Sequence, residues 1–408
     1  MKILYHHRTR SKDGQYVHIE ELTRALRGLG HEVRIVGPPQ NETEPFGADA
    51  GLIAVLKRRF PLALYEAMEL AYAWVAYRRL ERAYRDFRPD CLYERYNLFT
   101  PSGLWLHRKH RLPMLLEVNG PLVDERSRFG GLALKRLARW SERAVWCGAD
   151  YVLPVTRVLA GHVRSAGVPE ERIVVIPNGI DRDRFERAPS RPEAKRRLGL
   201  EDRLVLGFTG FVREWHGLER VIDFVAEGDP ALGLHLLAVG DGPAKASLAA
   251  HASRLGVGDR VVFTGVVDRD RIRDYIAAFD VALQPAVRPY ASPLKLFEYM
   301  VMGHAIVAPA TPNLREILTG GEDALLFDPG SDASFRDALE RLCADPDLRR
   351  RLGAAARRSI DEQGLTWADN ARRVEALFHR LGVGEAADGA GALTPRDRRE
   401  PPPGRAPA

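Results

Sequence analysis

Short apolar runs alternate with longer amphipathic segments along most of the chain. The pattern starts with a predicted strand over residues 2–6, a helix over 16–29 whose apolar side chains recur every three to four residues, and a strand over 32–36. Gly30 suits the end of that helix. Strands that alternate with helices of this length form parallel sheets with helices on both faces. The pattern therefore predicts an α/β fold.

The same alternation predicts two successive arrays. The first array continues with strands over 91–94, 114–118, 151–154 and 173–176, and with helices over 50–87 (interrupted near Pro61), 102–110, 132–147 and 158–166. The second array has strands over 204–209, 234–239, 261–263, 281–284 and 305–308, and helices over 218–227, 245–255, 269–278 and 293–302. Helices from about residue 334 to 381 complete the fold.

The segment 177–181 (PNGID) separates the two arrays, because proline, asparagine and glycine favour turns. We expect two doubly wound domains that face each other across a cleft at the carboxyl ends of their strands. The predicted units are an N-terminal domain over 1–176, a C-terminal domain over 177–365, a C-terminal helix over 366–383 and a disordered tail over 384–408. The tail is rich in Gly, Ala, Arg and Pro and too poor in apolar residues to fold.

Composition is that of a globular protein, with 45% hydrophobic and 28% charged residues in 408. Three cysteines are too few for a disulfide framework or a zinc cluster, which favours a reducing, cytoplasmic location. The opening MKILYHHRTR predicts no secretory signal. The longest apolar stretch, around 62–77, contains Glu66 and Glu69 and is too short to span a bilayer.

The net charge of +6 favours an anionic partner, although clustered Lys and Arg also occur on ordinary solvated helix faces. Lys57, Arg58 and Arg59 stand beside Phe60, Leu62, Leu64 and Tyr65, a mixture suited to the surface of an anionic membrane. Packing of these apolar residues in the core is the alternative.

The helix predicted over 293–302 has the features of an anion site. Ser292 is a typical N-cap residue, and the backbone N–H groups of Leu294 and Lys295 in the first turn lack partners within the helix. Free donors, the helix dipole and a lysine suit a diphosphate. Glu298, on the same face as Lys295, can accept from a pair of ribose hydroxyls. Alternatively, Lys295 and Glu298 only pair with each other on the surface.

Glycines mark three strand-to-helix turns in the second array, at 207–217, 239–243 and 264–267. They allow a close backbone approach to a ligand, and Arg213 adds a cation that can meet a phosphate. Each turn is common in unrelated proteins. Together they line the sheet edge at which an α/β domain binds a nucleotide.

In order and spacing, FTGFVREWHGLERVI, LLAVGDGP, VVFTGVVDRDRIRDYIAAFDVALQP, SPLKLFEYMVMGHAIVAP and VVIPNGIDRDRF resemble the nucleotide-sugar half of the retaining glycosyltransferases of family 4. DGQYVHIEELTRALRGLGHEVRIVG resembles that family's first loop, helix and second strand. The resemblance covers roughly residues 1 to 380. It implies the GT-B architecture, with two Rossmann-like domains, and transfer of a sugar from a nucleoside diphosphate with retention, without a metal or other cofactor.

The residue patterns above and the resemblance together predict site residues. Catalysis is assigned to Arg213, Lys295 and Asn119, which would hold the substrates in line and stabilise the departing diphosphate. The implied donor-binding residues are Gly14, Arg213, His216, Gly240, Gly265, Val266, Val267, Ser292, Leu294, Lys295 and Glu298. Glu298 would bind the ribose, 292–295 the diphosphate and 265–267 the base.

Three positions depart from the family pattern. Tyr290 stands where the family has the first glutamate of Glu-x7-Glu. Phe211 and His216 stand where it has an arginine and a lysine, with Arg213 between them, so the cation that stabilises the leaving group is left open. The first loop has one glycine, Gly14, where the family often has two.

The loop 117–125 follows a strand and is predicted to present Asn119, Asp124 and Glu125 to the acceptor. A glycine-proline turn with solvated acids is the alternative. His6 and Arg95, at strand ends, are further acceptor candidates. The expected acceptor is a glycan or a lipid-linked glycan.

Two Asp-x-Asp pairs, Asp181 with Asp183 and Asp268 with Asp270, resemble the metal sites of another transferase class. They precede helices or turns, so we expect them to act as caps. Rival functions are a sugar-nucleotide epimerase or hydrolase of the same fold, or a basic nucleic-acid-binding protein. The basic clusters lack interleaved aromatic residues, which argues against nucleic acid as a partner.

Overall fold

The structure, a computed structural model, describes residues 1–9, 14–38 and 60–384. The N-terminal domain contains a parallel five-stranded sheet with the strand order β2-β1-β3-β4-β5. Its strands are β1 (Lys2–His6), β2 (Glu32–Val36), β3 (Cys91–Arg95), β4 (Met114–Val118) and β5 (Tyr151–Pro154). The order reverses between β1 and β3, which makes that edge a topological switch point.

The C-terminal domain contains a parallel six-stranded sheet with the order β11-β10-β9-β6-β7-β8. Its strands are β6 (Leu204–Thr209), β7 (Leu234–Val239), β8 (Val261–Phe263), β9 (Val281–Leu283), β10 (Ala305–Pro309) and β11 (Leu325–Phe327). This is the Rossmann order, with its switch point between β6 and β9.

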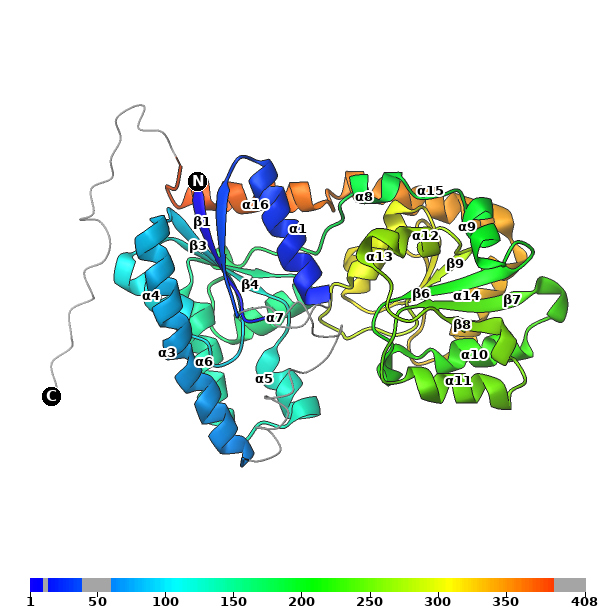
Figure 1. Ribbon diagram of the computed structural model, residues 1–408, viewed down its shortest axis with the longest axis horizontal. Helices are drawn as coiled ribbons and strands as arrows, with labels where there is room; N and C mark the ends of the chain where they lie inside the picture. Colours follow the sequence, from blue (N-terminus) through cyan, green and yellow to red (C-terminus); the bar gives the residue numbers. More distant parts are fainter. Residues whose placement is uncertain (10–13, 39–59, 385–408) are drawn as a thin grey trace, which may run out of the picture.

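Helices cover both faces of both sheets (Figure 1). The N-terminal domain has α1 (Gly14–Gly28), α3 (Leu62–Phe87), α4 (Ser102–His110), α5 (Leu122–Glu125), α6 (Lys135–Gly148) and α7 (Arg157–Ser165). The C-terminal domain has α8 (Asp183–Glu186), α9 (Arg191–Leu198), α10 (Glu219–Glu227), α11 (Lys245–Arg254), α12 (Ile272–Ile276), α13 (Leu294–Val301), α14 (Asp332–Ala344) and α15 (Pro346–Glu362), and α16 (Trp367–Arg380) follows. The predicted fold class is confirmed.

The structure corrects several predicted elements. Residues 173–176 are not a strand but form one bridge, between Ile173 and Val152. The short strand β11 and the helices α5, α8 and α9 were not predicted. The helix predicted from 132 begins at Lys135, because the buried Glu66 carboxylate accepts from the N–H groups of Ala133 (2.9 Å) and Leu134 (2.6 Å) just before it. Of the helix predicted over 50–87, residues 50–59 lie outside the described residues, and the described part forms α3, which begins after Pro61.

The last helix, α16, packs on the first domain. Trp367, Val374 and Phe378 join a buried cluster with Ile3 of β1 and Leu22 of α1. Figure 1 shows α16 lying beside α1 after crossing from the C-terminal domain. The chain therefore crosses twice between the domains.

Residues of the predicted boundary turn join the two domains directly. The Asn178 side-chain amide donates to the Ser292 carbonyl oxygen (2.6 Å), and the Asn178 N–H donates to Ser292 Oγ (3.2 Å). Asn178 Oδ1 lies 2.7 Å from Nδ1 of His18 on α1. These contacts place α1 opposite the start of α13.

Candidate functional site

A cleft of about 680 Å³ lies between the domains, at the carboxyl ends of both sheets. Its lining brings together many residues predicted from the sequence. They are Gly14, Arg95 and Asn119 from the N-terminal domain and Arg213, His216, Ser292, Leu294, Lys295 and Glu298 from the C-terminal domain. Gly14 opens α1, and a Cβ added there would lie 3.5 Å from the Leu294 side chain.

The start of α13 faces this cleft. Leu296, Phe297 and Met300 anchor the helix in the core, which leaves Lys295 and Glu298 on the face toward the cleft. The Leu296 N–H donates to the Pro293 carbonyl (3.1 Å), so the N–H groups of Leu294 and Lys295 precede the helical ladder, as predicted.

Ser292 does not cap α13, contrary to prediction, because Pro293 occupies the N-cap position without a side-chain bond. The Ser292 hydroxyl accepts from Asn178 instead. Ser292 therefore contributes to the seam between the domains.

Lys295 is the most perturbed cation at the site. Its ammonium lies 3.6 Å from the centroid of the Phe208 ring and forms no hydrogen bond with the protein. Burial lowers the pKa of Lys295 to about 7, although the nearby Glu298 opposes the shift. An anion at the start of α13 would restore the charge of this lysine.

Arg213, Arg288 and Lys295 form a cluster of positive charge around His216. Burial lowers the pKa of His216 to about 2, and the three cations lower it further. The His216 Nδ1 accepts from the Arg213 N–H (3.2 Å), so the neutral ring carries its proton on Nε2. His216 is therefore a neutral donor among cations. Arg288, which packs over the Trp215 ring at 5.2 Å, was not predicted.

Glu298 lies beside the cations without pairing with Lys295. Its Oε2 accepts from the Thr209 hydroxyl (3.4 Å), and burial raises its pKa while Arg269 and Lys295 oppose that shift. No ion pair joins Lys295 to Glu298, so the alternative of an isolated surface pair is wrong. The carboxylate remains available to hydroxyl donors in the cleft.

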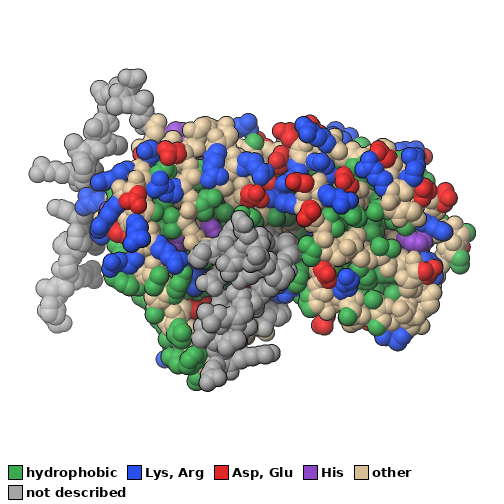
Figure 2. Space-filling model, viewed as in Figure 1, with side chains coloured by type: hydrophobic (Ala, Val, Ile, Leu, Met, Phe, Trp, Pro, Cys, Tyr) green, Lys and Arg blue, Asp and Glu red, His purple; other side chains and the backbone are tan. Residues whose placement is uncertain are grey.

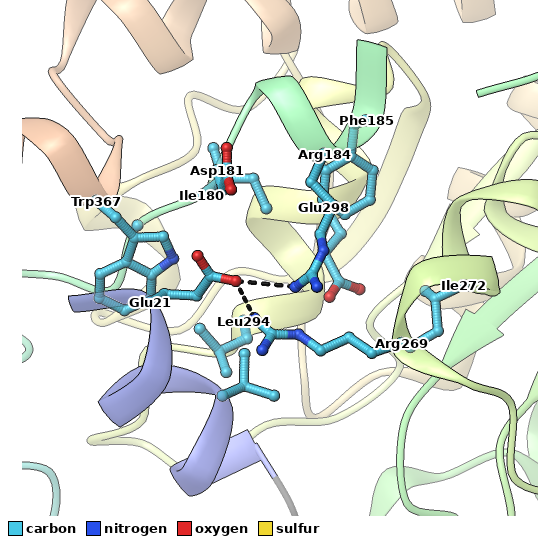
Figure 3. A pocket seen from close by; sticks show the side chains of 12 residues that line it. Glu21, Ile180, Asp181, Arg184, Phe185, Arg269, Ile272, Leu294, Glu298 and Trp367 are labelled. Atoms are coloured by element: carbon cyan, nitrogen blue, oxygen red, sulfur yellow. Dashed lines mark hydrogen bonds and ion pairs between the residues drawn. The ribbon is translucent and has the colours of Figure 1, made fainter. Parts of the chain in front are cut away.

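Beside Glu298, a buried carboxylate of α1 joins the two domains. Glu21 accepts from Arg184 (2.8 Å) and from Arg269, and Figure 3 shows both guanidinium groups converging on it next to Glu298. Glu20 also accepts from Arg269. These ionic contacts were not predicted, because the pattern of a single helix does not reveal which distant arginines face it.

Three predicted donor-binding residues line a smaller cavity of about 300 Å³ that adjoins the cleft. They are Gly240, Val266 and Val267. Gly265 is paired with Gly240 by a bridge and has a φ of 73°, in the left-handed region that favours glycine.

A third cavity, of about 350 Å³, lies on the N-terminal side and is lined by Arg95, Asn119, Glu125 and Tyr290 among others. Tyr290, which stands where the family has the first glutamate of Glu-x7-Glu, therefore lines this cavity. Its carbonyl accepts from the Thr156 hydroxyl (3.0 Å).

The buried Glu117 holds Arg95 and Asn119 in place by accepting from both of their side chains. Burial alone would raise the pKa of Glu117, but His18 and Arg95 hold it well below its usual range.

Two acceptor candidates do not line the cavities described above. His6 is buried, with its Nδ1 2.8 Å from Oε2 of Glu94. Asp124 is exposed and faces His162 at 3.5 Å. His6 is thus buried against Glu94 and Asp124 is exposed beside His162, and neither side chain lines the cleft.

The Asp-x-Asp pairs make no side-chain caps, contrary to prediction. Asp181 instead faces Arg24 (3.8 Å), and Asp270 pairs with Arg184 (2.9 Å). Among the described residues, no group of three or more His, Cys, Asp or Glu side chains is arranged to hold a metal ion.

Two family models match consecutive parts of the chain. The glycosyl transferase 4-like domain matches residues 13–179, and glycosyl transferases group 1 matches residues 190–359. A 2-deoxystreptamine glucosyltransferase of Streptomyces kanamyceticus is 33% identical over 184 residues, 44% of this chain and 47% of that protein. The match thus spans about half the length of that relative.

Longer matches cover both domains. A 2-deoxystreptamine N-acetyl-D-glucosaminyltransferase of Streptomyces fradiae is 28% identical, with 94% of each chain covered. The structure of Anabaena HepE in complex with UDP superposes with a TM-score of 0.69 at 19% identity, covering 93% of this chain and 100% of that one. Together with the two family models, these matches show that the chain belongs to the glycosyltransferases of family 4, with the GT-B architecture.

Proposed function

We propose that this protein transfers a hexosyl group from a nucleoside diphosphate sugar to a glycan or lipid-linked acceptor, with retention at the anomeric carbon. The observation that carries the proposal is that Arg213 and Lys295 line the cleft at the start of α13, with the charge of Arg288 acting on the same His216. Cations and unpaired N–H groups at a Rossmann switch point suit a diphosphate.

Each residue of the cleft has its own proposed role in the reaction. Glu298 accepts from the ribose hydroxyls, while Lys295, Arg213 and the N–H groups of α13 hold the diphosphate. As the bond to the sugar breaks, negative charge grows on the leaving diphosphate, and the same donors stabilise it more strongly. His216 adds a neutral donor through Nε2. Because the chain supplies these charges itself, we propose that the reaction requires no metal.

The cavity lined by Arg95, Asn119 and Glu125 is the proposed acceptor site. Asn119 lines both this cavity and the cleft, so it can orient an acceptor hydroxyl toward the donor sugar. Polar groups fixed by a buried carboxylate, here Glu117, are suited to that task because their positions are set before the acceptor binds.

We further propose a cytoplasmic protein that rests on an anionic membrane through the start of α3. Phe60, Leu62, Leu64 and Met68 are exposed there and not packed in the core, whereas Tyr65 is buried. Figure 2 shows apolar side chains gathered at this end of the molecule. Lys57, Arg58 and Arg59 lie outside the described residues. No described helix has the length and apolarity to cross a membrane.

Incubation with a panel of nucleotide sugars tests the central proposal. Acceptors should include lipid-linked glycans and 2-deoxystreptamine, the compound in the names of two relatives. We expect nucleoside diphosphate release that depends on acceptor, survives a chelator, and gives a product whose NMR spectrum shows the donor's anomeric configuration. Release without acceptor would indicate a hydrolase, and an isomerised donor an epimerase. If no nucleotide sugar is used or bound, the proposal fails.

Two binding assays test the partners. Sedimentation with phosphatidylglycerol vesicles should exceed sedimentation with neutral vesicles, and equal binding would remove the membrane proposal. Tight, salt-dependent binding to random DNA oligomers in the absence of nucleotide-sugar binding would favour the nucleic-acid alternative.

A further inference from the structure

The first turn of α1 reaches across to the C-terminal domain beside the cleft. The cavity of about 300 Å³ is lined on one side by Gly240, Val266 and Val267, and on the other by Tyr16 and Glu20 of α1. Tyr16 and Glu20 stand four residues apart and so share one face of the helix. The cavity is thus closed by both domains.

This cavity continues directly from the cleft, because Val17, Gly210 and Ile272 line both. A nucleotide with its diphosphate at Lys295 and its ribose at Glu298 would extend its base into this cavity. Much of the lining is apolar, which suits the flat faces of a base better than the hydroxyls of a sugar.

Ionic contacts fix α1 against the loop that carries the valines. Glu20 and Glu21 both accept from Arg269, which follows Val266 and Val267 after β8. Figure 3 shows Arg269 reaching from the C-terminal domain to Glu21 of α1. Tyr16 is therefore held opposite these valines from the other domain.

We propose that Tyr16 is a nucleobase-binding residue, which packs its ring on the base of the donor from the N-terminal domain. The inference rests on the proposed use of a nucleoside diphosphate sugar. It implies that the nucleoside end of the donor is enclosed between the two domains and not held by the C-terminal domain alone.

Calorimetric titration of UDP, GDP and inorganic pyrophosphate into the full chain tests the inference. Pyrophosphate carries no base, so it reports on the diphosphate site alone. Tyr16→Ala should weaken binding of the nucleoside diphosphate that the wild type prefers by about 5- to 150-fold, as expected for the loss of one aromatic–base contact. Pyrophosphate binding should not change. Tyr16→Phe should retain wild-type affinity.

Tyr84→Ala is the matched control, because Tyr84 is also half-buried but lies on α3, away from the cleft. Thermal midpoints verify folding, and Tyr16→Leu, which keeps apolar bulk without a ring, serves if the alanine variant does not fold. Unchanged nucleoside diphosphate affinity in Tyr16→Ala, or an equal loss for pyrophosphate, would overturn the inference. Failure of the wild type to bind any nucleoside diphosphate would instead overturn the proposed function on which it rests.

Discussion

The protonation of Lys295 should make donor binding depend on pH in the neutral to alkaline range. In the free protein, burial lowers the pKa of Lys295 to about 7 from a usual 10.5. A bound diphosphate near the ammonium favours its charged form and raises that pKa again. Binding above pH 7 must therefore take up a proton, and affinity must fall as the pH rises.

The expected change in affinity follows from the pKa of Lys295 in the free protein and its pKa in the complex. If the bound anion restores the usual value of Lys295, the affinity at pH 9 should be lower than at pH 7.5 by up to about 20-fold. Other groups of the site add little in this range, because His216, with a pKa lowered to about 2 by burial and neighbouring cations, stays neutral.

Titration calorimetry with a nucleoside diphosphate measures both the affinity and the proton uptake. Two buffers with different ionisation enthalpies should give different apparent enthalpies at pH 8, and the difference should report uptake of close to one proton. In Lys295→Arg, whose charge is permanent, both the uptake and the pH dependence should disappear. Buffer-independent enthalpies together with a constant affinity between pH 7.5 and 9 in the wild type would refute this account.

Three substitutions test the other parts of the site and the fold. Glu298→Gln loses a charge-assisted acceptor worth roughly 1.5–3 kcal/mol, so calorimetry should show donor binding about 10- to 150-fold weaker with an unchanged thermal midpoint; unchanged binding would mean that Glu298 does not contact the ribose. Arg213→Ala should lower kcat by about 100-fold or more, because negative charge grows on the leaving diphosphate in the transition state. The donor affinity should fall less than kcat. Steady-state kinetics in which only KM rises would contradict this role. Gly207→Ala places a Cβ 2.0 Å from the buried Phe279 ring and should lower the free energy of unfolding by about 1–3 kcal/mol in urea titrations. The control Gly28→Ala, with no heavy atom within 4 Å, should cost nothing, and an equal loss in both variants would refute the packing argument.

Strand positions could be predicted because both sheets are buried and parallel, which leaves continuous apolar runs between polar turns. Length alone does not explain the missed β11, because β8 and β9 also have three residues and were predicted. Residues 173–176 have the composition of a strand, but only Ile173 forms a bridge with β5. Local apolar patterning therefore does not by itself decide whether a segment pairs as a strand.

At the site, the sequence predicted the residues of α13, because an anion site at a helix start is built within one segment. It did not predict Arg288 or the contacts of Glu21 with Arg184 and Arg269, which arise where distant segments meet. The same limit explains the wrong expectation for Asp270. Its carboxylate can cap a turn or pair with a cation, and the position of Arg184 in space decides between these.

The two chain crossings between the domains are bonded to each other. Ile180 donates to the Leu365 carbonyl (3.0 Å), and Trp367 donates to the Ile180 carbonyl (3.2 Å), so both crossings pair side by side as one connection. Gly179 packs against this pair so closely that a Cβ there would lie 2.8 Å from the backbone at Thr366. A second set of contacts, from Arg269 to Glu20 and Glu21, joins the loop after β8 to α1. Arg269 lines the cavity with Tyr16 as well as the pocket of Figure 3 with Glu298, so these ionic contacts stand between the residues that we propose for the base and for the ribose.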